Sequence, residues 1–297
     1  MNRSTYSIEC YTSKTQVSNL NFSVYTHLIL RLHSVQVCFF ACTGLQTRIR
    51  WVYNKCIMGT LFVIATPIGN LEDITIRAIK TLFTVDGIAC EDTRRTGLLL
   101  DQLTKRYTTV IGGLDGKRPE LLRYDNRTEA IITPEIIDRL HQGNNVALVS
   151  DAGTPLVSDP GFILVREAIR KNIPIVSIPG PSAFLAALTT SGLPTDKFLF
   201  LGYPPEKKSK RIALFHELLS SLQTSKHFHP TILFYCAPHK LDQTLIDLKE
   251  VFGDIEIVIT RELTKVHEEI QKYFVSEAIQ QISQPHGEYV ILFNLTY

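Results

Sequence analysis

The sequence predicts an α/β fold built from two α/β domains, and two observations support this. From Thr60 onward, short runs of β-branched and apolar residues alternate with amphipathic helical stretches, which is the rhythm of βαβ units and a mainly parallel sheet. The segments 146–149 and 173–176 are apolar without alternation, as expected for strands that helices cover on both faces. No long linker or low-complexity segment separates the two halves. We therefore expect an N-terminal domain over 59–179 and a C-terminal domain over 180–297.

The elements follow in order from these patterns. The first half is expected to hold strands near 60–65, 86–90, 121–124, 145–150 and 174–178, with helices between them. After the turn Pro179-Gly180-Pro181, a helix over 182–191 leads into strands near 197–202, 231–235, 255–260, 268–274 and 288–295. Helices are expected over 206–223, 239–252 and 275–283. Asp73 or Thr75 is expected to cap the first helix.

Residues 1–58 form an extension that differs from the rest of the chain. Its apolar stretch, 28–42, contains Arg31, His33 and Gln36 and falls short of the roughly 20 apolar residues of a membrane-spanning helix. The stretch also begins too far from the terminus for a secretory signal. Because Met58 directly precedes the first strand, we expect the extension to be poorly ordered and to reflect a misplaced start. A transit peptide is the alternative.

Charge and cysteine content narrow the class of protein. The formal charge of the 297 residues is +2, but residues 1–57 contain six of the 31 Lys and Arg and one of the 29 Asp and Glu. The remaining 25 basic and 28 acidic residues argue against non-specific nucleic-acid binding through net charge, so any RNA contact must be a local basic patch. Only Cys90 and Cys236 lie beyond the extension, which fits a reducing cytoplasm. Cys38 and Cys42 have no companion pair, so no metal site is expected.

Three loops that follow predicted strands are unusual in composition, and ligands of open α/β sheets bind at that edge. In 66–71, Pro67 fixes φ and Gly69 can adopt a positive φ, which favours a stiff loop with an exposed backbone. In 150–161, Asp151 ends a buried strand and is placed to bind a ligand amine or hydroxyl. Asp159-Pro160 in the same loop is interpreted as a helix N-cap with proline at the first helical position. The third loop, 178–183, opens a helix whose free N–H groups suit a carboxylate or hydroxyl.

Two charged clusters, 90–96 and 261–269, also follow predicted strands directly. Charge runs are usually solvated faces, so each is weak evidence by itself. The sequence contains no Gly-x-Gly-x-x-Gly fingerprint and no Walker-type Gly-x-x-x-x-Gly-Lys motif, which argues against dinucleotide-binding and P-loop functions. It also contains no Gly-x-Ser-x-Gly elbow.

These loops, in this order, resemble the tetrapyrrole methylase superfamily, and in particular its branch that methylates small-subunit ribosomal RNA. The resemblance covers about 60–295 and rests on TPIGNL at 66–71, ACEDTR at 89–94, SDAGTP at 150–155, SDPG at 158–161, IPGPSA at 178–183, GLPTD at 192–196 and RELTK at 261–265. Porphyrin-branch members carry a Gly-x-Gly-x-Gly pattern in the first loop, so Thr66-Pro67-Ile68-Gly69-Asn70 favours the RNA branch. Departures occur in the stretches RYDNRTE at 123–129 and FYCAPHK at 234–240, which bear on substrate contacts.

The resemblance implies a function and a set of site residues. It implies S-adenosylmethionine as cofactor, a homodimer, and 2′-O-methylation of a cytidine ribose in the decoding region of 16S rRNA. The cofactor pocket would be lined by Pro67, Gly69, Asp151, Ala152, Gly153, Thr154, Pro155, Ser182, Ala183 and Tyr235. Two alternatives stay open: a methyltransferase of the same fold that acts on a tetrapyrrole or another small molecule, and a catalytically inactive RNA-binding relative.

Methyl transfer from a sulfonium to a ribose hydroxyl requires positioning and benefits from a nearby base, but needs no metal. The two charged clusters provide four candidate bases, among which the sequence does not choose: Glu91, Asp92, Glu262 and His267. The candidates for phosphate contact are Arg94, Arg95, Lys207, Lys208, Lys210, Arg211 and Lys265. The stretch 207–211 also fits a solvated helix start.

Overall fold

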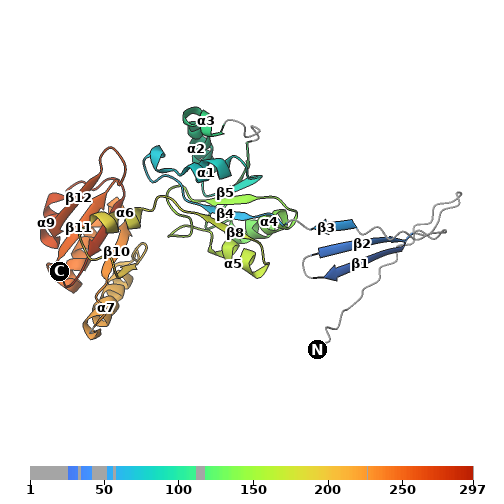
Figure 1. The fold of residues 1–297 in the computed structure, drawn as a ribbon. Helices are drawn as coiled ribbons and strands as arrows, with labels where there is room; N and C mark the ends of the chain where they lie inside the picture. Colours follow the sequence, from blue (N-terminus) through green and yellow to red (C-terminus); the bar gives the residue numbers. More distant parts are fainter. Residues whose placement is uncertain are drawn as a thin grey trace.

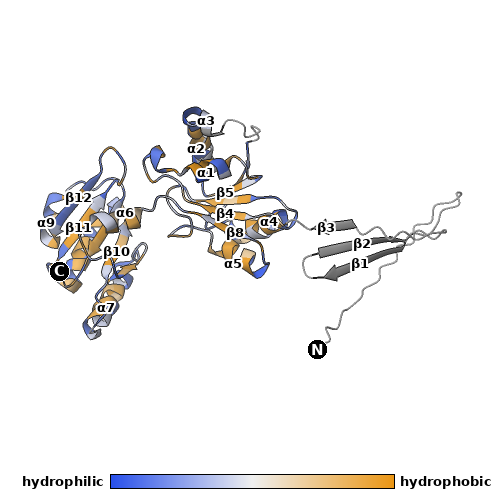
Figure 2. Ribbon diagram, viewed as in Figure 1, coloured by the Kyte–Doolittle hydropathy of each residue, from blue (hydrophilic) through white to orange (hydrophobic). Residues whose placement is uncertain are grey.

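The computed structural model describes residues 26–32, 35–41, 52–55, 58–111, 118–225 and 227–296. The segments from residue 58 onward contain two five-stranded sheets, one in each half of the chain (Figure 1). Figure 2 shows apolar residues along strands such as β4 and β5, and a mixture of apolar and polar residues on the helices. In this part of the chain, no helix is long and apolar enough to span a bilayer.

The first sheet is parallel throughout, with the strand order β6-β5-β7-β4-β8. Its strands are β4 (Leu61–Ile64), β5 (Gly87–Cys90), β6 (Glu120–Arg123), β7 (Val146–Val149) and β8 (Ile175–Ile178). Between them lie η1 (Leu71–Asp73), α1 (Ile76–Leu82), α2 (Thr93–Arg106), α3 (Thr108–Ile111), α4 (Glu129–His141) and α5 (Phe162–Arg170). All parallel strands end at one edge, so the loops after β4, β5 and β7 meet there.

Helices cover both faces of this sheet, as the unbroken apolar runs of its strands predict. On one face, Ile79 of α1 and Leu100 of α2 pack against Ile88 of β5. On the other face, Ile136 of α4 and Leu164 of α5 belong to a second buried cluster (Figure 1). The sheet is therefore a rigid support for the loops at its carboxyl edge.

The second sheet is mixed, with the strand order β12-β11-β13-β10-β9. Its strands are β9 (Phe198–Phe200), β10 (Thr231–Cys236), β11 (Glu256–Arg261), β12 (Glu269–Phe274) and β13 (Tyr289–Phe293). Only β9 and β10 pair in parallel; the other pairings are antiparallel. The helices are α6 (Ala183–Thr190), α7 (Lys208–Thr224), η2 (Pro238–Lys240), α8 (Leu241–Phe252) and α9 (Val275–Gln281). The parallel arrangement of the first sheet is therefore not repeated in this half, where the short connection 262–268 joins β11 and β12 as a hairpin.

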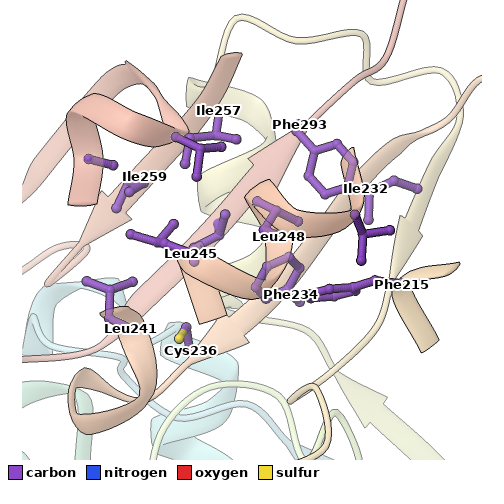
Figure 3. Packing of buried hydrophobic residues seen from close by; sticks show 14 of the residues in the cluster. Phe215, Ile232, Phe234, Cys236, Leu241, Leu245, Leu248, Ile257, Ile259 and Phe293 are labelled. Atoms are coloured by element: carbon purple, nitrogen blue, oxygen red, sulfur yellow. The ribbon is translucent and has the colours of Figure 1, made fainter. Parts of the chain in front are cut away.

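The larger core of the second half lies between this sheet and the helices α7, α8 and α9. Phe234 of β10, Phe293 of β13 and Leu248 of α8 point into it from three elements (Figure 3). Phe215 of α7 packs its ring 6.1 Å from that of Phe234. The opposite face of the sheet packs against α6, where Leu188 meets Leu233 and Leu292 in a separate cluster. That face looks toward the first half of the chain (Figure 1).

Within the extension, the structure describes three strands, β1 (Thr26–Leu32), β2 (Val35–Ala41) and β3 (Val52–Lys55). They form an antiparallel sheet in the order β1-β2-β3 and pair only with one another. The expectation of a poorly ordered extension otherwise falls on residues outside the described ones.

At the carboxyl edge, one local expectation is confirmed and another is corrected. Thr75 caps α1, since its side chain accepts a hydrogen bond from the Ala78 N–H at 3.1 Å. Gly69 can adopt a positive φ but does not do so in this loop. Asp159 does not cap α5, because that helix begins at Phe162 and its N-cap is Gly161, with φ 136°.

Candidate active site

A cleft at the carboxyl edge of the first sheet is lined by most of the residues that the sequence predicts for cofactor binding. One wall comes from the loops after β4, β5 and β7, and the other from the start of α6 and the second sheet. The first wall consists of Ile68, Glu91, Asp151, Ala152, Gly153, Thr154, Val157, Ser158 and Asp159. The second wall consists of Ser182, Ala183, Tyr203, Tyr235, Leu263, Glu288, Tyr289 and Val290. The first wall is acidic and the second is largely aromatic and apolar.

Glu91 and Asp151 lie side by side because β5 and β7 are neighbouring parallel strands. Cys90 pairs with Val149 in the sheet, so the residues that follow each strand emerge together. The Asp151 backbone N–H donates to Oε1 of Glu91 at 3.3 Å. Glu91 is half-buried, and this burial, together with the charge of Asp159, raises its pKa to about 7. A carboxyl with that pKa can exchange protons at neutral pH.

Asp159 is turned into the cleft by a strained loop. Leu156 and Ser158 adopt φ values of 70° and 69°, a region that residues with a Cβ rarely occupy. Burial and the negative charge of Asp151 raise the pKa of Asp159 to about 6, although a hydrogen bond with Ser150 opposes the shift. Asp159 therefore belongs to the site, which its interpretation as a helix N-cap did not predict.

Asp151 connects this wall to the start of α2. Its Oδ1 accepts a hydrogen bond from the Asp92 N–H at 3.1 Å, and its Oδ2 lies 3.3 Å from Nη1 of Arg95. The loop itself is tied to the third one, since the Thr154 hydroxyl donates to the Pro181 carbonyl at 3.1 Å. These contacts fix the loop while the Asp151 carboxylate still borders the cleft.

The other three candidate bases do not line the cleft. Asp92 caps α2 by accepting a hydrogen bond from the Arg94 N–H at 2.9 Å, and its pairing with the Arg94 side chain lowers its pKa. Glu262 binds Nζ of Lys265 at 2.9 Å, which lowers the pKa of Glu262. His267 is exposed on the β11–β12 connection. Of the four candidates, only Glu91 borders the cleft.

The expected cofactor residues divide between two hollows. Asp151, Ala152, Gly153, Thr154, Ser182, Ala183 and Tyr235 line the cleft. Pro67 and Gly69 instead line an adjacent groove against α2, formed with Leu71, Arg95, Thr96, Leu99, Gln102 and Asp151. Pro155 lines neither. Asp151 belongs to both hollows and is the point where they meet.

Gly69 is required for a close approach between the two halves of the chain. A Cβ at this position would lie 2.3 Å from Cγ of Lys265 and 3.2 Å from the Leu263 carbonyl oxygen. Thr264 in the facing segment adopts a φ of 63°. The first loop therefore packs directly against the β11–β12 connection.

The sequence reading missed several cleft residues from the second sheet, namely Tyr203, Leu263, Glu288, Tyr289 and Val290. Glu288 and Tyr289 reach the cleft because β13 lies between β10 and β11, an order that long-range strand pairing sets. Tyr203 follows the short edge strand β9, and its ring packs 5.3 Å from that of Tyr235. The motif around Tyr235 offered one indirect signal for this wall, but no composition bias marks the others.

The expected phosphate contacts also divide. Arg94 and Arg95 are exposed at the start of α2, beside the cleft, and each pairs with an aspartate. Lys265 is held by Glu262 and by Glu288, whose Oε2 is 3.1 Å from its Nζ. At the start of α7, Lys207 and Lys210 are exposed, whereas Lys208 pairs with Asp247 and Glu250.

The expectation for Arg211 is wrong. Its side chain is 2% exposed and forms an ion pair with the fully buried Asp247, whose Oδ2 lies 2.9 Å from Nε. Its Nη1 also donates to the carbonyls of Pro205 and Glu206, at 3.0 Å each. The guanidinium is buried and bound to groups of the protein itself, so it is not accessible to a phosphate. The basic stretch 207–211 does not reveal the structural role of Arg211, because its partner Asp247 lies on α8, which is distant in sequence.

Known proteins resemble this chain over most of its length. The family model described as Tetrapyrrole (Corrin/Porphyrin) Methylases matches residues 60–279. A Thermotoga maritima protein named Ribosomal RNA small subunit methyltransferase I is 44% identical over 237 residues, which cover 79% of this chain and 98% of the relative. A Synechocystis protein of the same name is 42% identical and covers 79% of this chain and 78% of its own length.

Solved structures share the fold at low sequence identity. Diphthine synthase superposes with a TM-score of 0.56 at 15% identity, over 80% of this chain and 90% of that structure. Uroporphyrin-III-C-methyltransferase from Thermus thermophilus gives a TM-score of 0.52 at 17% identity, over 79% and 94%. At these identities the likeness shows the fold alone, while the family model and the curated relatives cover most of the sequence. This chain belongs to the tetrapyrrole (corrin/porphyrin) methylase family.

Proposed function

We propose that this chain is an S-adenosylmethionine-dependent methyltransferase that methylates the ribose 2′-hydroxyl of a cytidine in the decoding region of 16S rRNA. The curated relatives named Ribosomal RNA small subunit methyltransferase I support the substrate class. The observation that carries the chemistry is Glu91, a half-buried carboxyl in the cleft whose pKa burial raises to about 7.

The residues of the cleft fit the cofactor. Four carboxyl groups, those of Glu91, Asp151, Asp159 and Glu288, border one cavity and favour a ligand that carries positive charge. The second wall supplies Tyr235 and small residues at the start of α6. When bound, S-adenosylmethionine supplies a methyl carbon attached to a positively charged sulfur. Asp151, Ala152, Gly153, Thr154, Ser182, Ala183 and Tyr235 would hold it.

Glu91 is the proposed base for the transfer. The bound cofactor would supply the methyl group: its carbon–sulfur bond would break, with the electron pair left on sulfur, as the 2′-oxygen bonds to the methyl carbon. Glu91 accepts the proton that leaves the hydroxyl, so charge is conserved and no redox partner is needed. A base with a pKa near the working pH combines a deprotonated ground state with useful basicity. Positioning of the hydroxyl against the methyl carbon supplies the rest of the rate.

The basic residues around the cleft mouth are proposed to contact the RNA backbone. Arg94 and Arg95 lie at the start of α2, and Lys265 lies on the β11–β12 connection. The side chains of Arg94 and Arg95 are largely exposed, and ion pairs that reach solvent are weak and can exchange for phosphate. Lys207 and Lys210 extend the same function to the start of α7.

A homodimer is proposed as the working assembly. The face formed by α6 and β9 exposes Leu185, Phe198 and Leu199, and Phe198 packs 6.2 Å from Phe184. Exposed apolar side chains that cluster on one face favour an interface. Light scattering on the full chain measures the assembly: a mass of two chains supports the dimer, and a mass of one chain refutes it.

Two measurements separate this proposal from its rivals. Calorimetric titration with S-adenosylmethionine excludes an inactive RNA-binding relative if binding is seen, and contradicts the proposal if none is seen. Labelled cofactor is then offered with small ribosomal subunits or with a tetrapyrrole. Label in RNA alone supports the proposal, whereas label in the tetrapyrrole alone assigns the small-molecule alternative.

A further inference from the structure

Tyr203 is a large aromatic side chain left open on the lip of the cleft. It is 59% exposed, whereas Tyr289 on the same wall is 3% exposed and Tyr235 is half-buried. An exposed aromatic side chain loses hydrophobic stabilisation, so its position at the mouth of a polar cavity calls for an explanation. Neither the sequence motifs nor the proposed cofactor contacts assign it a role.

The ring is held from behind by a continuous row of aromatic side chains. Phe184 of α6 stacks on Phe200 at 4.8 Å between centroids, and Phe200 meets the edge of Tyr235 at 4.9 Å. Tyr235 then packs 5.3 Å from Tyr203. The backbone is also fixed, because the Tyr235 N–H donates to the Gly202 carbonyl at 2.8 Å. Tyr203 is therefore a pre-positioned surface that loses little freedom when a ligand packs on it.

The backbone before Tyr203 runs close to the acidic wall of the cleft. Gly202 has a φ of 65°, and a Cβ there would lie 3.2 Å from Oγ of Ser158. Ser158 immediately precedes Asp159, and both residues line the cleft. The cleft mouth is thus bordered by Tyr203 on one side and by the loop that carries Asp159 on the other.

We propose that Tyr203 is the stacking platform for the base of the target nucleotide, and so a determinant of RNA recognition; the inference rests on the proposed function. A ribose inside folded RNA reaches an enclosed methyl donor only if its nucleotide leaves the stack, and the exposed base then needs a new partner. Aromatic side chains fill that role in single-stranded RNA recognition. The more enclosed Tyr235 and Tyr289 are reached by a small cofactor, whereas the open face of Tyr203 is reached by a macromolecule.

The test uses the full chain and three variants, Tyr203→Phe, Tyr203→Leu and Tyr203→Ala. Steady-state methylation of unmodified small ribosomal subunits gives kcat and KM, and calorimetry gives the dissociation constant of S-adenosylmethionine. Loss of the ring is expected to lower kcat/KM for RNA about tenfold or more in the Leu and Ala variants. Tyr203→Phe is expected to stay within about twofold of the unsubstituted protein, because the ring and not the hydroxyl provides stacking.

Phe228→Ala is the matched control, since Phe228 is exposed, aromatic and absent from the cleft lining. The inference holds if the Leu and Ala variants lose RNA turnover while cofactor affinity and thermal unfolding stay unchanged. Equal weakening of cofactor binding and turnover would overturn it and assign Tyr203 to the cofactor. Unchanged turnover in the Ala variant would also overturn it. If the unsubstituted protein methylates no RNA, the proposed function itself has failed.

Discussion

Gly69 and Lys265 meet where the two halves of the chain close on each other. A Cβ on Gly69 would lie 2.3 Å from Cγ of Lys265, inside any allowed contact distance. The first loop of the parallel sheet and the β11–β12 connection of the mixed sheet therefore pack together at this point. Lys265 in turn binds Glu288, a residue of the cleft. A glycine outside the main cleft thus supports one of its walls.

Gly69→Ala is expected to destabilise the protein by about 1–3 kcal/mol through overpacking, and to reduce methyl transfer. The nearest clash is with a side chain, so adding Lys265→Ala should restore part of the stability. The Leu263 carbonyl, 3.2 Å from the added Cβ, prevents full recovery. Urea unfolding measures both variants. Gly97→Ala in α2 is the control: its nearest non-helix atom is 3.4 Å away, so the change should be neutral or stabilising. Equal losses at both glycines would contradict the packing argument.

Glu91→Gln is expected to lower kcat on the order of 100-fold or more, because the amide cannot accept the proton of the ribose hydroxyl. The dissociation constant of S-adenosylmethionine should change little by comparison. In the unsubstituted protein, single-turnover rates should rise as pH increases through about 7, because burial and Asp159 raise the pKa of Glu91 to that value. A rate that is flat from pH 5.5 to 8.5, with chemistry limiting, is incompatible with Glu91 as the base.

The same substitution should affect stability in the opposite sense to activity. A carboxyl whose folded pKa lies above its unfolded pKa of 4.5 binds more protons in the folded state, so its contribution to stability falls as pH rises from about 4.5 to about 7. Glu91→Gln removes this penalty and should stabilise the protein at pH 8 by on the order of 1 kcal/mol, after allowance for solvent screening. At pH 4 the two proteins should differ much less. Thermal unfolding at both pH values measures the difference, and an equal shift at both would assign the effect to packing.

Asp159→Asn is expected to move the acid limb of the pH–rate profile to lower pH. The negative charge of Asp159 helps to raise the pKa of Glu91, so its neutral isostere lets Glu91 ionise more easily. Asp151, whose charge also raises the pKa of Glu91, and Arg95, whose charge lowers it, remain in place as the other charges near Glu91. If the variant is slower at every pH and its acid limb does not shift, Asp159 instead stabilises the conformation of the loop.

Asp247→Ala is expected to cost about 3–5 kcal/mol of stability, because it leaves the Arg211 guanidinium buried without its partner. The double variant Arg211→Met with Asp247→Leu should be more stable than either single change. Lys208→Met, which removes only the exposed partner of Asp247, should cost less than about 1 kcal/mol. Guanidinium unfolding of these variants, with the single changes Arg211→Met and Asp247→Leu included, tests the assignment of Arg211 to the fold. If the Asp247→Ala variant is stable but binds RNA more weakly, the result would instead support Arg211 as a phosphate contact.

Much of the architecture followed from local patterns, because strand length, turn residues and unbroken apolar runs reflect local geometry. The places of Glu91 and Asp151 were also accessible, since both end buried strands that a parallel sheet brings to one edge. Asp159 was misinterpreted because an Asp-Pro pair before a helix has the pattern of an N-cap, and nothing local shows that the loop turns inward. Arg211 and Tyr203 depend on contacts with distant strands and helices. Their burial or exposure is set by tertiary packing, which a single sequence does not reveal.

The most direct test of the central claim is to map the methyl group. The full chain is incubated with S-adenosylmethionine and small ribosomal subunits that lack the modification, and the RNA is then cleaved with alkali, which spares a bond next to a 2′-O-methyl ribose. The proposed function predicts one new alkali-resistant position, at a cytidine in the decoding region, that disappears with Glu91→Gln. Cofactor binding without any resistant position in the RNA would contradict ribose methylation as the activity of this chain.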